Sequence, residues 1–247
     1  MTDTKDQIII AKDRCQLAIY GADIFEKAAL KAVQHSGKFS VAISGGSNPR
    51  PMNRLLSQKP YRHVIPWTYT HLFWVDERLL PLTDPQSNYG NAKIDFLDQL
   101  EIPEDNIHPI RCAKEPTAVA ESYQRELVTF FNPSIGQYPI FDLIFLGIGT
   151  DGHTASLFSG DDIAVNTRRW VCAVKGGNPN VDRVTLSLPL INQARCVVIL
   201  ACSKEKSGII NKIFLDKNAN LPIQNVSPTN GRLIWLLDQD AAAMLPG

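Results

Sequence analysis

An aspartate and a histidine, Asp151 and His153, stand two residues apart in a turn that follows the apolar segment Phe141–Leu146. An imidazole group can accept and return a proton near neutral pH, and a neighbouring carboxylate can orient it. The segment has the length and composition of a buried parallel strand, and a helix is predicted to begin at Thr154. Because such turns at the carboxyl edge of a sheet often carry chemistry, we predict an active site here. The alternative is a histidine that only hydrogen-bonds within its own turn.

Three glycines in the same turn, Gly147, Gly149 and Gly152, match the pattern G-x-G-x-x-G of dinucleotide-binding proteins. That pattern needs an acidic residue about 20 residues further on, at the end of the next strand. The next apolar segment, Trp170–Val174, is followed by Lys175 instead. We therefore predict no nicotinamide or flavin cofactor.

A second polar turn, SGGSNP, follows the strand-like segment Phe39–Ile43 and precedes a helix that Pro49 can begin. In such a turn, free backbone N–H groups and the positive end of the helix dipole face one point. We predict that Gly45, Gly46 and Ser47 bind phosphate or another anion. The alternative is a tight turn without a ligand.

A charged triplet, DER, comes directly after the strand-like segment His71–Val75, where a solvated loop is the ordinary interpretation. The carboxyl ends of parallel strands meet at one edge of a sheet, so we expect Asp76 to enter the pocket of the other two turns. Arg78 is suited to a phosphate, because a guanidinium group donates two parallel hydrogen bonds. Arg183 falls on a predicted strand, and Lys206 in the first turn of a predicted helix.

Strands and helices alternate along the chain, without internal repeats or a flexible linker. This order predicts one α/β domain over residues 1–247, with a doubly wound, mostly parallel sheet and helices on both faces. The predicted strands are Ile8–Ala11, Phe39–Ile43, His71–Val75, a short one within Pro103–Ile110, Phe141–Leu146, Trp170–Val174, Val184–Leu188, Arg195–Ala201 and the apolar part of Gly231–Asp238. The predicted helices are Arg14–Gln34, one that begins at Pro49, 91–100, Thr117–Phe131 and Ser203–Leu215.

The composition narrows the class of protein. The 247 residues are 44% hydrophobic and 20% charged, and equal numbers of acidic and basic residues give a net charge of zero, so neither nucleic acid nor a membrane surface is an expected partner. Five cysteines are scattered without C-x-x-C spacing, which predicts free thiols in the cytosol. The five histidines lack the spacing of metal ligands, so no structural metal is expected.

Four motifs, in this order, resemble those of the 6-phosphogluconolactonases. They are SGGSNP, WVDER with the later Ser87-Asn88, GIGTDGHTASLF, and RVT at 183–185 with the downstream Lys206. The resemblance covers nearly the whole chain, and DGHTASLF is its most specific part. The chain departs from the usual family residues at Asp84, Asn48 and Ser159, none of which carries the expected chemistry.

The resemblance implies hydrolysis of the lactone of 6-phosphogluconate in the oxidative pentose phosphate pathway, without a metal or an organic cofactor. His153 would activate the water and return the proton to the ring oxygen, helped by Asp76 or Asp151. The groups implied for the phosphate are Gly45, Gly46, Ser47, Arg78, Arg183 and Lys206.

Two alternatives remain open in the sequence. Glucosamine-6-phosphate deaminases share the DGH element, but they have a glutamate five residues after the histidine, where this chain has Phe158. A phenylalanine carries no proton, so the lactonase is favoured. A non-catalytic sugar-phosphate binding protein would be expected to have lost the histidine or the basic residues, and both are present.

Overall fold

The central element of the fold is a seven-stranded sheet. The computed structural model describes residues 6–112, 115–160 and 163–246 of the chain. Neighbouring strands in the sheet are parallel, in the order β1-β10-β9-β6-β2-β3-β5. These strands are β1 Asp6–Ala11, β2 Phe39–Ile43, β3 Thr70–Trp74, β5 Ile107–His108, β6 Leu143–Leu146, β9 Cys196–Ala201 and β10 Arg232–Asp238.

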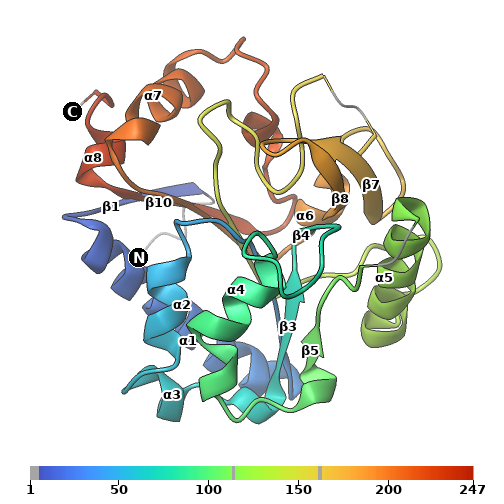
Figure 1. Cartoon of the computed structure of the whole chain (residues 1–247). Helices are drawn as coiled ribbons and strands as arrows, with labels where there is room; N and C mark the ends of the chain where they lie inside the picture. Colours follow the sequence, from blue (N-terminus) through green and yellow to red (C-terminus); the bar gives the residue numbers. More distant parts are fainter. Residues whose placement is uncertain (1–5, 113–114, 161–162, 247) are drawn as a thin grey trace.

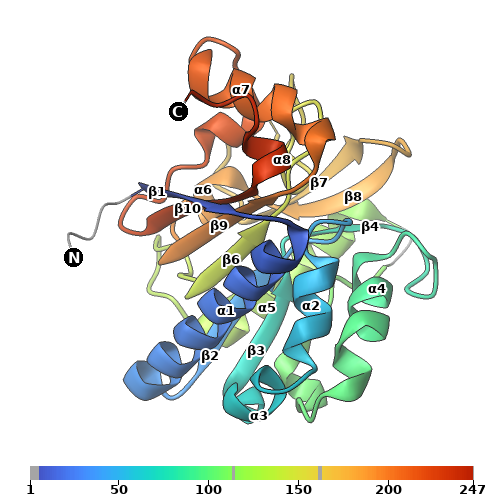
Figure 2. The same cartoon turned by 90° about the vertical axis from the view of Figure 1, so that its left-hand side faces the viewer.

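Helices cover both faces of this sheet (Figures 1 and 2). The α-helices are α1 Arg14–Ser36, α2 Arg50–Leu56, α3 Tyr61–Val64, α4 Asn88–Asp95, α5 Pro116–Phe131, α6 Leu188–Ile191, α7 Ser207–Leu215 and α8 Gln239–Ala242. Short 3₁₀ helices span Trp67–Tyr69, Leu97–Gln99, Glu104–Asn106, Lys204–Lys206 and Pro222–Asn225. The predicted doubly wound, mostly parallel sheet is confirmed.

Aromatic side chains attach the helices to the two faces of the sheet. From α1, the buried Phe25 ring lies 5.3 Å from Phe39 on β2, measured between centroids. From the end of α5, Phe131 lies 5.8 Å from Phe73 on β3. The central strands are apolar along their whole length because both faces are covered in this way.

A second, three-stranded sheet stands beside the carboxyl edge of the first. It is antiparallel, in the order β4-β8-β7, with β4 Asp76–Arg78, β7 Val171–Gly176 and β8 Val181–Leu186. The charged triplet DER thus forms an edge strand and not a solvated loop. The two strands predicted at 170–174 and 184–188 are present, but they pair antiparallel in this second sheet and not in the parallel one. The connection from β7 to β8 is a short turn, and a parallel crossover needs about a dozen residues or more.

The helix predicted to begin at Thr154 does not form. Thr154 and Leu157 instead make an isolated antiparallel bridge, and Gly152 and Ala155 have positive φ angles of 84° and 50°. The hydroxyl of Thr154 donates to the carbonyl of Gly147 at 2.8 Å, and the next hydroxyl along, that of Ser156, binds a side chain on β4. These two side-chain bonds, one local and one to a distant segment, replace the predicted helix, so no helix begins directly after His153.

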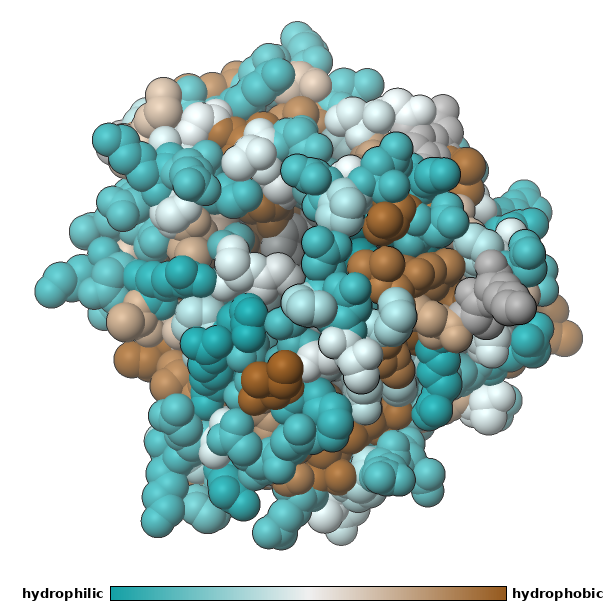
Figure 3. Space-filling view, in the orientation of Figure 1, coloured by the Kyte–Doolittle hydropathy of each residue, from teal (hydrophilic) through white to brown (hydrophobic). Residues whose placement is uncertain are grey.

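Polar residues cover most of the face seen in Figure 3 and surround a hollow near its centre. Within the described ranges, no helix combines the length and the apolar composition that a bilayer crossing requires.

Candidate active site

A pocket of about 230 Å³ opens at the carboxyl edge of the neighbouring strands β2 and β6. The chain continues from these two strands toward opposite sides of the sheet, which is where open α/β sheets bind ligands. The lining includes the predicted residues Gly45, Gly46, Ser47, Asp76, Arg78, His153, Arg183 and Lys206. Asp151 does not line it but contacts His153. The described residues contain no group of three or more His, Cys, Asp or Glu side chains arranged for a metal ion.

The His153 ring is held by Asp151. Ring Nδ1 lies 2.5 Å from Asp151 Oδ1, and the backbone N–H of His153 donates to the same oxygen at 3.2 Å. A Cβ on Gly149 would lie 2.2 Å from Nδ1, so only glycine permits this approach. Burial raises the pKa of Asp151, but the hydrogen bonds and the charge from His153 outweigh it and leave the pKa below its ordinary value. A carboxylate that accepts from Nδ1–H leaves Nε2 as the basic ring nitrogen.

Asp76 is a buried carboxylate fixed by side chains from three other segments. The Ser156 hydroxyl donates to its Oδ2 at 2.7 Å, and Asn88 Nδ2 donates to its Oδ1 at 3.2 Å. Arg183 Nη1 lies 3.9 Å from Oδ2. Asp76 therefore presents an oriented acceptor in the pocket, while Asp151 orients the imidazole.

Glu77 is a supporting residue that sequence reasoning missed. Its side chain has no exposed surface and accepts hydrogen bonds from the backbone N–H groups of Arg78, Asn88 and Tyr89, each at 2.8 Å, and from the Ser87 hydroxyl at 3.0 Å. Burial raises its pKa, and the backbone hydrogen bonds only partly oppose this. Glu77 thereby joins the start of α4 to β4. The pairing of WVDER with a downstream Ser-Asn was the signal in the sequence.

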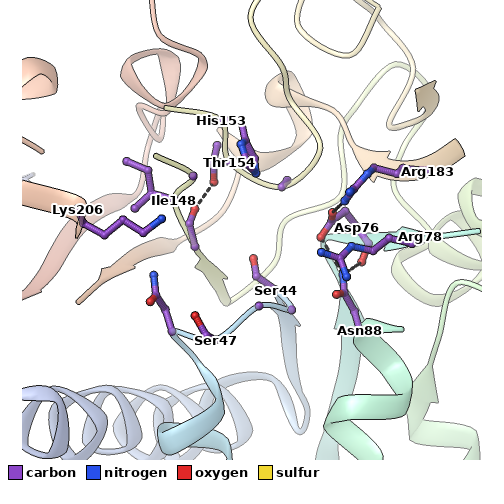
Figure 4. Close-up of a pocket in the computed structure, with 16 residues that line it drawn as sticks. Ser44, Ser47, Asp76, Arg78, Asn88, Ile148, His153, Thr154, Arg183 and Lys206 are labelled. Atoms are coloured by element: carbon purple, nitrogen blue, oxygen red, sulfur yellow. Dashed lines mark hydrogen bonds and ion pairs between the residues drawn. The ribbon is translucent and has the colours of Figure 1, made fainter. Parts of the chain in front are cut away.

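The Gly45–Ser47 turn forms the floor of the pocket (Figure 4). A Cβ on Gly45 would lie only 1.8 Å from Asn88 Oδ1, so the turn packs directly against the asparagine that binds Asp76. Arg14, in the first turn of α1, donates to the Ser47 carbonyl at 2.5 Å. The turn is thus held by side chains from two other segments of the chain.

Basic side chains stand on two sides of this floor. Arg78 and Arg183 lie together on one side and Lys206 on the other (Figure 4), so the three do not gather at one point. Arg78 donates from Nη1 to the Gln86 carbonyl at 2.5 Å, while its buried Nε has no hydrogen-bond partner in the described part of the chain. A bound anion could satisfy such a donor.

Burial changes the proton affinity of two of these cations. It lowers the pKa of Arg183, although Asp76 acts in the opposite direction. It also lowers the pKa of Lys206, against the opposing charges of Glu205 and Asp151. Both groups are therefore incompletely solvated, which favours pairing with an anion.

Comparisons with known proteins give one consistent result. The family model described as "Glucosamine-6-phosphate isomerases/6-phosphogluconolactonase" matches residues 12–235. The chain is 41% identical to a 6-phosphogluconolactonase of Synechocystis over 87% of this chain and 88% of the relative, and 33% identical to that of Nostoc over 98% and 99%. The solved 6-phosphogluconolactonase of Trypanosoma brucei superposes with a TM-score of 0.87 at 28% identity, covering 98% of both chains.

Proposed function

The chain belongs to the glucosamine-6-phosphate isomerase/6-phosphogluconolactonase family, and we propose that it hydrolyses 6-phospho-D-glucono-1,5-lactone to 6-phosphogluconate. The observation that carries this proposal is the His153–Asp151 pair beside a glycine turn flanked by basic side chains. The same reaction would serve the oxidative pentose phosphate pathway. The curated relatives with the 6-phosphogluconolactonase name support the same substrate.

Lactone hydrolysis needs a base for the water and an acid for the leaving oxygen, and His153 can be both. Nε2 accepts a proton as the water oxygen bonds to the lactone carbonyl carbon, which gives a tetrahedral oxyanion. When the ring C–O bond breaks, the imidazolium returns that proton to the departing ring oxygen. Asp151 stabilises the imidazolium between the two steps, and Asp76 accepts a hydrogen bond from the water or a substrate hydroxyl. No covalent intermediate is required.

The phosphate is proposed to bind on the Gly45–Ser47 turn. Backbone N–H groups of the turn donate to it, and the flanking cations Arg78, Arg183 and Lys206 supply the attraction. The unpaired Nε of Arg78 supports this role, because a phosphate oxygen would satisfy it. Asp76 offsets part of the charge of Arg183, so Arg78 is expected to contribute more to binding.

The deaminase alternative receives less support from the same pocket. Phe158 occupies the position of the deaminase glutamate, and its ring centroid lies 5.2 Å from that of His153. Its ring also lies under the Arg183 guanidinium, at 5.7 Å. An apolar ring in this place packs the catalytic groups but transfers no proton.

The test is a direct assay of lactone hydrolysis. Glucose-6-phosphate dehydrogenase generates the lactone in place, and its disappearance is followed with and without the protein, because the lactone also opens spontaneously. Ammonia release from glucosamine-6-phosphate is measured in parallel. Acceleration without ammonia supports the lactonase, and ammonia without acceleration would move the protein to the deaminases. Inactivity in both assays would leave a sugar-phosphate binding protein.

We also propose that the protein works in the cytosol. None of the five cysteines forms a disulfide, and Cys172, Cys196 and Cys202 are buried, which suits a reducing compartment. Fractionation of cells with an antibody to the native protein tests this location.

A further inference from the structure

Strand β1 lies at one end of the seven-stranded sheet and pairs only with β10 among the described residues. Figure 2 looks onto this edge, with α1 below the strand and α8 above it. The side chains of Ile8 and Ile10 point to the same face and remain 47% and 51% exposed. A strand edge with unpaired backbone groups and exposed isoleucines is a template for pairing with another chain.

The sequence of this edge, DQIIIAK from Asp6 to Lys12, is complementary to itself. In an antiparallel pair of two copies centred on Ile9, Ile8 of each copy stands opposite Ile10 of the other. Asp6 of each copy then stands opposite Lys12 of the other, and neither residue forms an ion pair with another described residue. If the pair were centred on Ile10 instead, Ile8 would stand opposite Lys12, and the match of apolar and charged residues would be lost.

We propose that β1 is a docking surface for a second copy of this chain, joined antiparallel about a two-fold axis at Ile9. The two central sheets then form one continuous sheet, because both outer edges find the backbone partners they lack. Four isoleucines cover one another on one face, and an Asp6–Lys12 pair closes each end. The contact of one short strand is small beside the standard interface of about 1,600 Å², so we expect a weak dimer that forms only at high protein concentration.

A charge swap tests the register. Sedimentation velocity of the full chain is measured from about 1 to 200 µM, which extends to concentrations high enough for a weak dimer. Each single variant, Asp6→Lys or Lys12→Asp, places like charges opposite each other at both ends of the strand pair. Because two ion pairs are lost and replaced by repulsion, each variant should weaken the dimer about tenfold. The double variant Asp6→Lys/Lys12→Asp restores the pairs and returns dimerisation to the wild-type level. A double variant no better than either single one would overturn the register.

A cysteine test identifies the two-fold axis independently. In a Cys15→Ser background, which removes the exposed native thiol, Ile9→Cys is oxidised at a concentration where the dimer is populated. Directly opposite residues have Cβ atoms about 4.5–5.5 Å apart. The cysteine at position 9 therefore forms a disulfide with the same position of the second chain, whereas Gln7→Cys, which faces Ala11 of the second chain, does not. Circular dichroism melts matching the parent verify that both variants are folded.

Three outcomes contradict the proposal. A monomer at every concentration excludes the second copy as the occupant of the edge. Equal cross-linking at positions 7 and 9 excludes the symmetric register. The third outcome is that β1 binds something other than a second copy in a closed dimer. Open-ended oligomers of this chain, or a strand of a different protein bound at β1, would show this.

Discussion

The Nδ1 atom of His153 and the Oδ1 atom of Asp151 lie 2.5 Å apart, and the same oxygen accepts the backbone N–H of His153. One carboxylate oxygen thus fixes both the ring and the chain that carries it. The ring cannot present Nδ1 to a substrate without breaking this contact, so Nε2 is the ring nitrogen that remains available to a substrate. Most of the Asp151 side chain is exposed, at 65%, so solvent weakens its charge effect on the ring.

The first prediction separates the roles of these two residues. His153→Ala should lower kcat by about 10²–10⁴, because the base for the water and the acid for the leaving oxygen are lost together. Asp151→Asn keeps an acceptor for Nδ1–H but removes the charge. Asp151→Asn should lower kcat less than His153→Ala does. Because Asp151 is mostly exposed, the loss should also be smaller than the roughly 10⁴-fold loss for a buried triad aspartate. Initial rates of lactone hydrolysis measure both, and an active, folded His153→Ala protein would refute the assignment.

The second prediction concerns the phosphate. Arg78→Ala should raise KM for the lactone at least tenfold, because a charge-assisted hydrogen bond is worth about 1.5–3 kcal/mol. The change in kcat should be smaller, since Arg78 is proposed to bind the phosphate and not the reacting carbonyl. Arg62→Ala, which removes an exposed arginine outside the pocket, is the matched control. An unchanged KM in Arg78→Ala would remove Arg78 from the binding site.

The third prediction is a pH dependence from Lys206. Since burial lowers its pKa below the ordinary value, the cation loses its proton earlier than an exposed lysine as the pH rises. Binding of 6-phosphogluconate, measured by calorimetry to avoid spontaneous lactone opening, should therefore weaken on the alkaline side of neutrality. Lys206→Arg keeps its charge and should show a flat profile over the same interval. Parallel profiles in the two proteins would contradict this role.

The fourth prediction addresses Glu77. Glu77→Gln places an amide donor among the N–H groups that the carboxylate accepts, so the free energy of unfolding should fall by about 1–3 kcal/mol. In the wild type, the folded chain retains the Glu77 proton above the ordinary glutamate pKa, where the unfolded chain has released it. Stability should therefore fall as the pH rises through that interval, and Glu77→Gln should lack this component. Urea denaturation measures both effects, with exposed Glu121→Gln as the control.

The fifth prediction concerns the floor of the pocket. Gly45→Ala forces Asn88 away, because the new Cβ would lie 1.8 Å from its Oδ1, and the displaced amide no longer orients Asp76. We expect a loss of about 1–3 kcal/mol in stability, as for other overpacked sites, together with a raised KM. Gly208→Ala in α7 meets no atom within 4 Å and should be neutral or slightly stabilising. Equal behaviour of the two variants would mean that the turn adapts freely.

Apolar strands and their polar ends were predictable from the sequence, because a strand buried on both faces leaves a continuous apolar run. The segment 141–146 and the turn after it are the clearest example. The end of α1 was predictable too, since Gly37 adopts a φ of 75° there. The sequence was sufficient to predict such elements because neighbouring residues alone determine them.

The errors arose where distant residues determined the local structure. The segment from Thr154 resembles a helix start, but Ser156 binds Asp76, 80 positions earlier in the chain. The charged residues Asp76 and Glu77 resemble a loop, yet they pair with β8, and Asn88 and Ser156 donate hydrogen bonds to Asp76. The separation of Lys206 from the two arginines also depends on the whole sheet order, which no local pattern encodes.

The strand order has a consequence for the newly made chain. β6 lies between β2 and β9, so the sheet beneath the pocket is complete only when β9 has been synthesised. Lys206 follows later still, in the 3₁₀ helix just before α7. A ribosome-bound fragment that ends before β9 would contain the Gly45–Ser47 turn and His153, but its pocket would lack Lys206 and the strand beside β6. Such contacts between distant segments also slow folding, so activity should appear late, after release from the ribosome.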